Sequence, residues 1–201
     1  MKKGGSVARI GEVDRKTKET KISLKLNIDG RGKSDISTSI PFLDHMLELM
    51  CAHGFFDITL KATGDIKVDY HHTMEDIGIC LGEGVKKALG DKGKIKRYGQ
   101  ALLPMDETLA CVVLDISNRP HLVYNVNVEA RKIGDLDTEL MKEFFQGFAI
   151  HSGTTLHINI LYGQNTHHIF ESIFKAFGKA LDEATSMDKR IEGPLSTKGI
   201  L

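Results

Sequence analysis

The sequence repeats itself, and this internal duplication is the feature that most constrains the fold. Residues 71–88 and 167–184 align without gaps, and six of their 18 positions are identical, including two adjacent histidines and a glutamate. Two shorter matches lie upstream in the same order. They pair His53 with His151, and Glu19 with Glu107. Three ordered matches predict two homologous halves, near residues 1–92 and 93–201, that share one core.

Each half is predicted to form the same series of elements. Residues 20–28 alternate between polar and apolar side chains, as in a half-buried strand, and Pro41 suits the first turn of a helix that runs to about His53. The other expected elements of the first half are strands at 34–40, 55–63 and 65–70 and a helix from about Thr73 to Leu89. The second half is expected to have strands near 107–117, 121–129 and 154–162 and helices near 136–151 and 167–185. We therefore expect an α+β fold with an antiparallel sheet and two helices in each half.

The composition restricts the class of protein. Lys plus Arg equals Asp plus Glu, at 27 each, so we expect neither a general nucleic-acid binder nor a protein of anionic membranes. The sequence has no long apolar run and no apolar segment after its N-terminal lysines, which argues against a transmembrane helix and a secretory signal. Cys51, Cys80 and Cys111 are far apart and have apolar neighbours. This predicts buried, reduced thiols in a cytoplasmic protein.

A motif of the form His-His-x-x-Glu occurs twice, at 71–75 and 167–171. On a helix, residues four apart lie on one face, so the first histidine and the glutamate of each motif can hold one ion. The second histidine points roughly 100° away around the helix and should serve another ion. The duplication therefore predicts two metal sites, each built from both halves. The candidate ligands are His71, His72, Glu75, His167, His168 and Glu171.

Imidazole and carboxylate donors without thiolates favour a borderline-hard divalent ion of high coordination number. Mn²⁺ fits this set better than a structural zinc, and iron or cobalt could substitute. His45 is a further candidate, because it lies on a predicted helix and its repeat partner Glu143 can also bind metal. His53 and His151 stand beside glycines at predicted helix ends, where they would either cap a helix or contact substrate.

The strings FLDHML, DYHHTMEDIGI, PMDET, NTHHIFESIFKAF and STKG resemble the imidazoleglycerol-phosphate dehydratase family, and the resemblance runs over residues 6–201. It implies a hydro-lyase of histidine biosynthesis that dehydrates imidazole glycerol phosphate to imidazole acetol phosphate through an imidazolate held by two Mn²⁺ ions. It also implies a fold similar to the second domain of ribosomal protein S5. The expected assembly is a homo-oligomer of 24 subunits with active sites at subunit interfaces.

The resemblance also assigns roles to single residues. One ion would be held by His45, His72, His167 and Glu171, and the other by His71, Glu75, His168 and the residue at position 143. Many relatives have histidine where this chain has Glu143, and glycine where it has Ser39 and Asn118. The acid–base groups would be Glu19, Asp106 and Glu171. The substrate-binding set would be Arg97, Arg119, Lys175, Ser196 and Lys198, mainly for the phosphate, with His53 as a further candidate.

Three other classes of protein fit parts of the pattern. The duplicated motif alone would permit a metal-storage shell, but Glu19, Arg97, Arg119 and the STKG tail argue against it. A nucleic-acid binder on an S5-like fold is disfavoured by the zero net charge. A two-metal phosphatase would normally use bridging carboxylates, whereas this ligand set is rich in imidazole.

Overall fold

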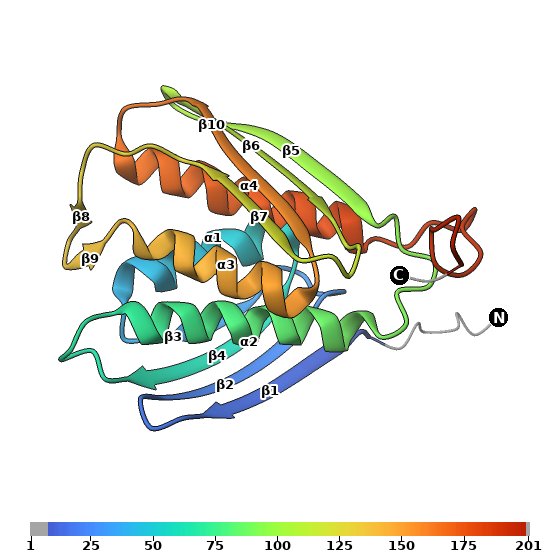
Figure 1. Cartoon of the computed structure of the whole chain (residues 1–201), viewed down its shortest axis with the longest axis horizontal. Coiled ribbons are helices and arrows are strands. Elements are labelled where there is room, and N and C mark those ends of the chain that lie inside the picture. Colours follow the sequence, from blue (N-terminus) through green and yellow to red (C-terminus); the bar gives the residue numbers. More distant parts are fainter. Residues whose placement is uncertain (1–7, 200–201) are drawn as a thin grey trace.

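Two sheets enclose a layer of helices in the computed structural model, which describes residues 8–199 (Figure 1). The first sheet contains β1 (Ile10–Lys16), β2 (Thr20–Asn27), β3 (Ser34–Ser37) and β4 (Asp57–Gly64), and its half also contains α1 (Pro41–Gly54) and α2 (His71–Leu89). The second sheet contains β5 (Tyr98–Met105), β6 (Thr108–Asp115), β7 (His121–Asn125) and β10 (Thr155–Tyr162). Its half also contains α3 (Leu140–Ser152), α4 (Thr166–Thr185) and a small hairpin of β8 (Lys132–Ile133) and β9 (Leu136–Asp137).

The two large sheets have the same strand order, and their registers agree except at a bulge in β10 between Ile160 and Tyr162. The orders are β1-β2-β4-β3 and β5-β6-β10-β7, so each strand of one sheet has a counterpart in the other. Ile10 pairs with Asn27 in the first sheet, and the corresponding residues of the second sheet, Tyr98 and Asp115, pair in the same way. This correspondence supports our proposed division into two related halves.

The α+β class is confirmed, and three details of the strand prediction were wrong. The sheets are mixed, because β3 runs parallel to β4 and β7 runs parallel to β10. In each half a helix connects these two strands, and a crossover of that kind returns the chain in the parallel direction. The expected strand at 65–70 is a loop in which Ile66 and Val68 are exposed. The strands β1 and β5 were not predicted, because they are edge strands with mostly polar sequence or irregular alternation.

The halves are held together through their helices. α2 packs on the first sheet and against α3, while α4 packs on the second sheet and against α1. Two glycines allow the backbones to approach closely: a Cβ on Gly78 of α2 would lie 2.1 Å from the carbonyl oxygen of Phe144, and a Cβ on Gly178 of α4 would lie 2.5 Å from that of Met50. Phenylalanines of α3 and α4 fill the centre, with Phe148 and Phe177 edge to face at 4.9 Å.

One segment breaks the resemblance between the halves. Residues 38–40 connect β3 to α1, whereas residues 126–139, including the β8–β9 hairpin, connect β7 to α3. Ser39 and Asn118 have positive φ angles of 67° and 57°, a backbone conformation that glycine adopts most readily. Cys51 and Cys80 are buried and Cys111 is partly buried, and all three are free thiols. In the described part of the chain, no helix has the length and apolar character needed to cross a bilayer.

Candidate metal centre and substrate site

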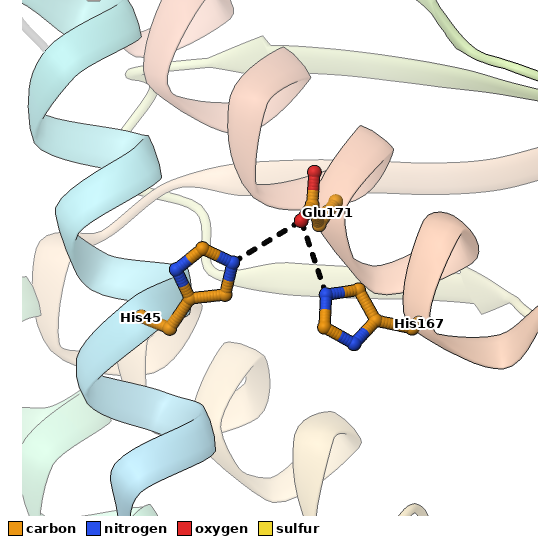
Figure 2. Close-up of side chains that lie close together, drawn as sticks. All are labelled: His45, His167 and Glu171. Carbon is orange, nitrogen blue, oxygen red and sulfur yellow. Dashed lines mark hydrogen bonds and ion pairs between the residues drawn. The ribbon is translucent and has the colours of Figure 1, made fainter.

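His45, His167 and Glu171 meet where α1 and α4 cross (Figure 2). The Oε1 atom of Glu171 lies 3.1 Å from Nε2 of His45 and 3.0 Å from Nε2 of His167. The three donor atoms all lie within 4.8 Å of one another. The family resemblance implied that these three residues share one ion with His72. The fold brings the three together within a single chain, and His72 is not among them.

Local structure explains how α4 presents its two donors. The side-chain oxygen of Asn165 accepts hydrogen bonds from the backbone N–H groups of His167 and His168, so Asn165 caps the helix and fixes where it begins. His167 and Glu171 then lie one turn apart on the face toward α1. Phe42 of α1 packs edge-on against the His167 ring at 5.3 Å, which restricts the orientation of that ring.

Glu171 is held in its ionised form. Burial alone would raise its pKa, but hydrogen bonds from Lys175, His45 and His167 lower the pKa to about 2. The Nζ atom of Lys175 lies 2.6 Å from Oε2, so Oε1 remains directed at the two imidazoles. An anionic oxygen beside two imidazole nitrogens fits a borderline divalent cation such as Mn²⁺ or Zn²⁺.

A pocket of about 440 Å³ adjoins this cluster. It is lined by His45 and His167 and by apolar side chains of three segments: α1, the loop before α2, and the β8–β9 hairpin. The apolar members include Phe42, Tyr70 and Ile133. A flat aromatic ring could therefore enter beside the cluster with little desolvation cost.

The other candidate ligands do not join a cluster of three in the part of the chain that is described. They are His71, His72, Glu75, Glu143 and His168. The Nδ1 atom of His72 lies 3.0 Å from Oδ2 of Asp65 and 3.9 Å from Glu19. The hydrogen bond with Asp65 raises the pKa of His72.

His168 has a similar environment in the second half. Its Nδ1 atom lies 2.7 Å from Oε2 of Glu107, and its Nε2 atom lies 3.9 Å from Asp106. The hydrogen bond with Glu107 raises the pKa of His168 and lowers that of Glu107. The candidate acid–base groups Glu19 and Asp106 thus lie at matching turns, β1–β2 and β5–β6, each beside the second histidine of a motif.

Four of the predicted substrate-binding residues line one cleft. These are Arg97, Arg119, Ser196 and Lys198. The Arg97 guanidinium is fixed by two bonds to Asp115, at 2.7 Å and 3.0 Å, and by a 2.7 Å bond to the carbonyl oxygen of Leu195. Arg119 is largely exposed and lies 3.7 Å from the same aspartate. Arginines, a lysine and a hydroxyl around one cleft suit a phosphate group.

The other two predicted substrate-binding residues lie elsewhere. Lys175 is beside Glu171 in the metal cluster. His53, near the end of α1, has its pKa lowered by burial and by the positive charges of Lys175 and Lys179. The sequence reasoning missed Asp65 and Asp115 as partners of site residues. Asp65 has no counterpart in the repeat. Asp115 reaches Arg97 because β5 and β6 pair with Tyr98 opposite Asp115, and the sequence alone does not show this pairing.

The candidate metal cluster (His45, His167 and Glu171) and the candidate phosphate cleft (Arg97, Arg119, Ser196 and Lys198) lie at opposite ends of α4. The backbone N–H of Arg97 donates to the carbonyl oxygen of Ala184, in the last turn of the helix, whereas Glu171 is near its beginning. At 1.5 Å per residue, these positions are about 20 Å apart along the axis. In Figure 1 the start of α4 is at the left and the C-terminal segment is at the right.

Comparison with known proteins places these features in a family. The profile of imidazoleglycerol-phosphate dehydratase matches residues 38–181. The chain is 58% identical over 195 residues to the imidazoleglycerol-phosphate dehydratase of Pelobacter propionicus, covering 97% of this chain and 100% of the relative. It is 56% identical to that of Acetivibrio thermocellus, covering 94% and 97%.

Two crystal structures of such enzymes share the fold. One is from Staphylococcus aureus, with a TM-score of 0.81 and 40% identity over 89% of this chain and 99% of that one. The other, from Pyrococcus furiosus in complex with (S)-C348, has a TM-score of 0.82 and 40% identity over 94% and 100%. The profile, the curated relatives and the solved structures agree, and the chain therefore belongs to the imidazoleglycerol-phosphate dehydratase family.

Proposed function

We propose that the chain performs the dehydration of its family, a step of histidine biosynthesis, at a composite site with two divalent metal ions. The substrate is imidazole glycerol phosphate and the product is imidazole acetol phosphate. The observation that carries the proposal is the convergence of His45, His167 and Glu171 on one point, beside a pocket with apolar walls that is large enough for an imidazole ring.

The ligands of the first ion would be His45, His167 and Glu171, with His72 supplied by another copy of the chain. His71, Glu75, His168 and Glu143 would hold the second ion. Glu143 corresponds to His45 in the repeat, and a carboxylate oxygen there would suit Mn²⁺. When held by these residues, two such ions would supply Lewis-acid chemistry to the substrate's imidazole ring, which would then be a better electron source for expelling the neighbouring hydroxyl.

The remaining chemistry is proton transfer. The hydroxyl must be protonated as it leaves, and the next carbon must lose its hydrogen before the enol becomes a ketone. Glu19 and Asp106 are candidates for these transfers, because each lies beside a motif histidine and is exposed at the end of the molecule that carries the metal ligands. Glu171, whose carboxylate lies beside two imidazoles, would combine metal binding with proton transfer.

The phosphate would bind to Arg97, Arg119, Ser196 and Lys198. The short glycerol chain of the substrate cannot span the roughly 20 Å between this cleft and the metal cluster of the same chain. A complete site therefore requires at least two copies, with the metal cluster of one beside the phosphate cleft of another. Lys175 and His53 would then approach the substrate from the chain that carries the metal. This reasoning supports a homo-oligomer, and we propose that it has 24 subunits. We also propose that the protein acts in the cytoplasm.

Metal content, particle size and ketone formation together test the proposal. We expect the purified protein to contain divalent metal, to form a large particle, and to convert imidazole glycerol phosphate to a ketone only when metal is bound. The metal-storage alternative predicts bound metal without turnover. Turnover that persists at full rate after complete removal of metal would refute the two-ion site.

A further inference from the structure

The second histidine of each motif is held by a carboxylate on its Nδ1 atom. His72 pairs with Asp65, at 3.0 Å and 3.3 Å from the two carboxylate oxygens, and His168 pairs with Glu107 at 2.7 Å. The two carboxylates come from different places in the repeat. Asp65 lies in the loop between β4 and α2, whereas Glu107 lies in the turn between β5 and β6.

We propose that Asp65 and Glu107 are positioning residues that fix the rings of His72 and His168 and leave Nε2 of each ring as the metal-binding nitrogen. The proposal rests on the proposed function, since it assumes that both histidines bind metal. An imidazole that donates from Nδ1 to a carboxylate has its lone pair on Nε2, and such partners commonly orient histidine ligands. The position of Asp106, 3.9 Å from Nε2 of His168, places a candidate acid–base group on the metal-binding side of that ring.

Glu107 also fixes the helix that carries His168. Its Oε1 atom accepts hydrogen bonds from the backbone N–H groups of Asn165 at 2.8 Å and Gln164 at 3.3 Å. Asn165 in turn caps α4 through the N–H groups of His167 and His168. One carboxylate therefore sets both the orientation of a ring and the position of the turn from which two candidate ligands project.

This arrangement explains why two repeat partners differ. Glu107 corresponds to Glu19, but Glu107 is occupied by four hydrogen-bond partners: His168, Asn165, Gln164 and Thr108. In the first half Asp65 occupies Nδ1 of His72, and Glu19 stays 3.9 Å away with about half of its side chain exposed. Asp65 thus takes the orienting role in that half and leaves the Glu19 carboxylate free for substrate.

The test compares the Mn²⁺ affinity of the wild type with that of seven variants, measured by calorimetric titration of the assembled full-length protein; two of the seven are the histidine variants His72→Ala and His168→Ala. We expect Asp65→Ala and Glu107→Ala each to weaken the affinity of one ion by about 10- to 100-fold, the range for lost partners of histidine ligands. Asp65→Asn and Glu107→Gln should weaken the Mn²⁺ affinity less, because an amide oxygen can still accept a hydrogen bond from Nδ1 of the histidine. Glu12→Gln is the matched control, since Glu12 is an exposed carboxylate paired with Lys25 on the outer face of the first sheet.

A second readout separates positioning from general structural damage. Co²⁺ loaded into the protein reports ligand geometry through its visible absorption, which should change in the two alanine variants and not in Glu12→Gln. Wild-type affinity and an unchanged Co²⁺ spectrum in all four variants of Asp65 and Glu107 would overturn the positioning role. The positioning role would also be overturned if the carboxylate variants lost as much Mn²⁺ affinity as His72→Ala and His168→Ala, because the carboxylates would then be metal ligands themselves. If the two histidine variants also bind metal normally, the ligand set of the proposed function fails instead.

Discussion

Mixing two inactive variants should restore activity, because the metal cluster and the phosphate cleft of one chain cannot serve the same substrate. Glu171→Gln removes the anionic oxygen shared by His45 and His167. Arg119→Ala removes a cleft cation whose side chain is 69% exposed, so the fold should tolerate its loss. Glu171 lies near the start of α4, a helix of 20 residues about 30 Å long, whereas Arg119 lines the cleft beside the other end of that helix.

The activity expected of the mixed particles can be calculated from the fraction of their sites that are complete. In particles co-assembled from equal amounts of the two variants, half of the metal clusters and half of the phosphate clefts are intact. If each site draws these parts from different chains at random, about a quarter of the sites are complete, and the activity should approach about a quarter of the wild-type value. A site contained in one chain would give no complete copies at all.

The assay is ketone formation by particles that were co-expressed with two different affinity tags and purified through both. Each variant alone should be nearly inactive and should form a particle of wild-type size by gel filtration. The double variant, expressed with wild type at the same ratio, checks that random assembly occurs. Mixed particles no more active than the better single variant would refute the argument from distance.

Three further outcomes are expected. Gly78→Ala should lower the free energy of unfolding, measured with denaturant, by about 1–3 kcal/mol or more, because the new Cβ would lie 2.1 Å from the Phe144 carbonyl oxygen. Gly93→Ala is the control and should change this free energy little, because the nearest atom to its Cβ belongs to a flexible side chain at 3.2 Å. In metal-free protein, the lowered pKa of Glu171 means that its ionised form contributes stability above pH 4.5, and this contribution is lost as the pH falls toward about 2. Glu171→Gln should therefore flatten the acid limb of a stability–pH curve, and an identical curve would contradict the ion pairs. Chelation should abolish turnover and added Mn²⁺ should restore it, with metal content followed by elemental analysis.

The part of the site that the sequence predicted depends on short-range geometry. His167 and Glu171 were expected to share an ion because residues four apart lie on one helical face, and the structure brings them to the same point. His45 was included among the candidate ligands because its partner in the repeat, Glu143, is also a type of residue that binds metal. The prediction of the remaining ligands stays open, because those residues do not gather within the described part of a single chain.

Longer-range contacts had no signal in the sequence. Residues 65–70 alternate like a strand, but Ile66 and Val68 face solvent, and the loop instead brings Asp65 to His72. The parallel strand pairs that make both sheets mixed were also not predicted, because strand direction depends on where the connecting helices cross. Alternation along a strand reports which side chains are buried, and it carries no information about which neighbour the strand will pair with.

The extra segment between β7 and α3 makes the two halves chemically unequal. Its hairpin adds Ile133 and Leu136 to the wall beside His45 and His167, whereas the first half has only residues 38–40 at the corresponding place. If divalent ions bind as proposed at this cluster and at its counterpart, the unequal walls should give the two ions different rates of exchange with the medium. Gradual dialysis would then pass through a particle that retains one of the two proposed ions after the other has left.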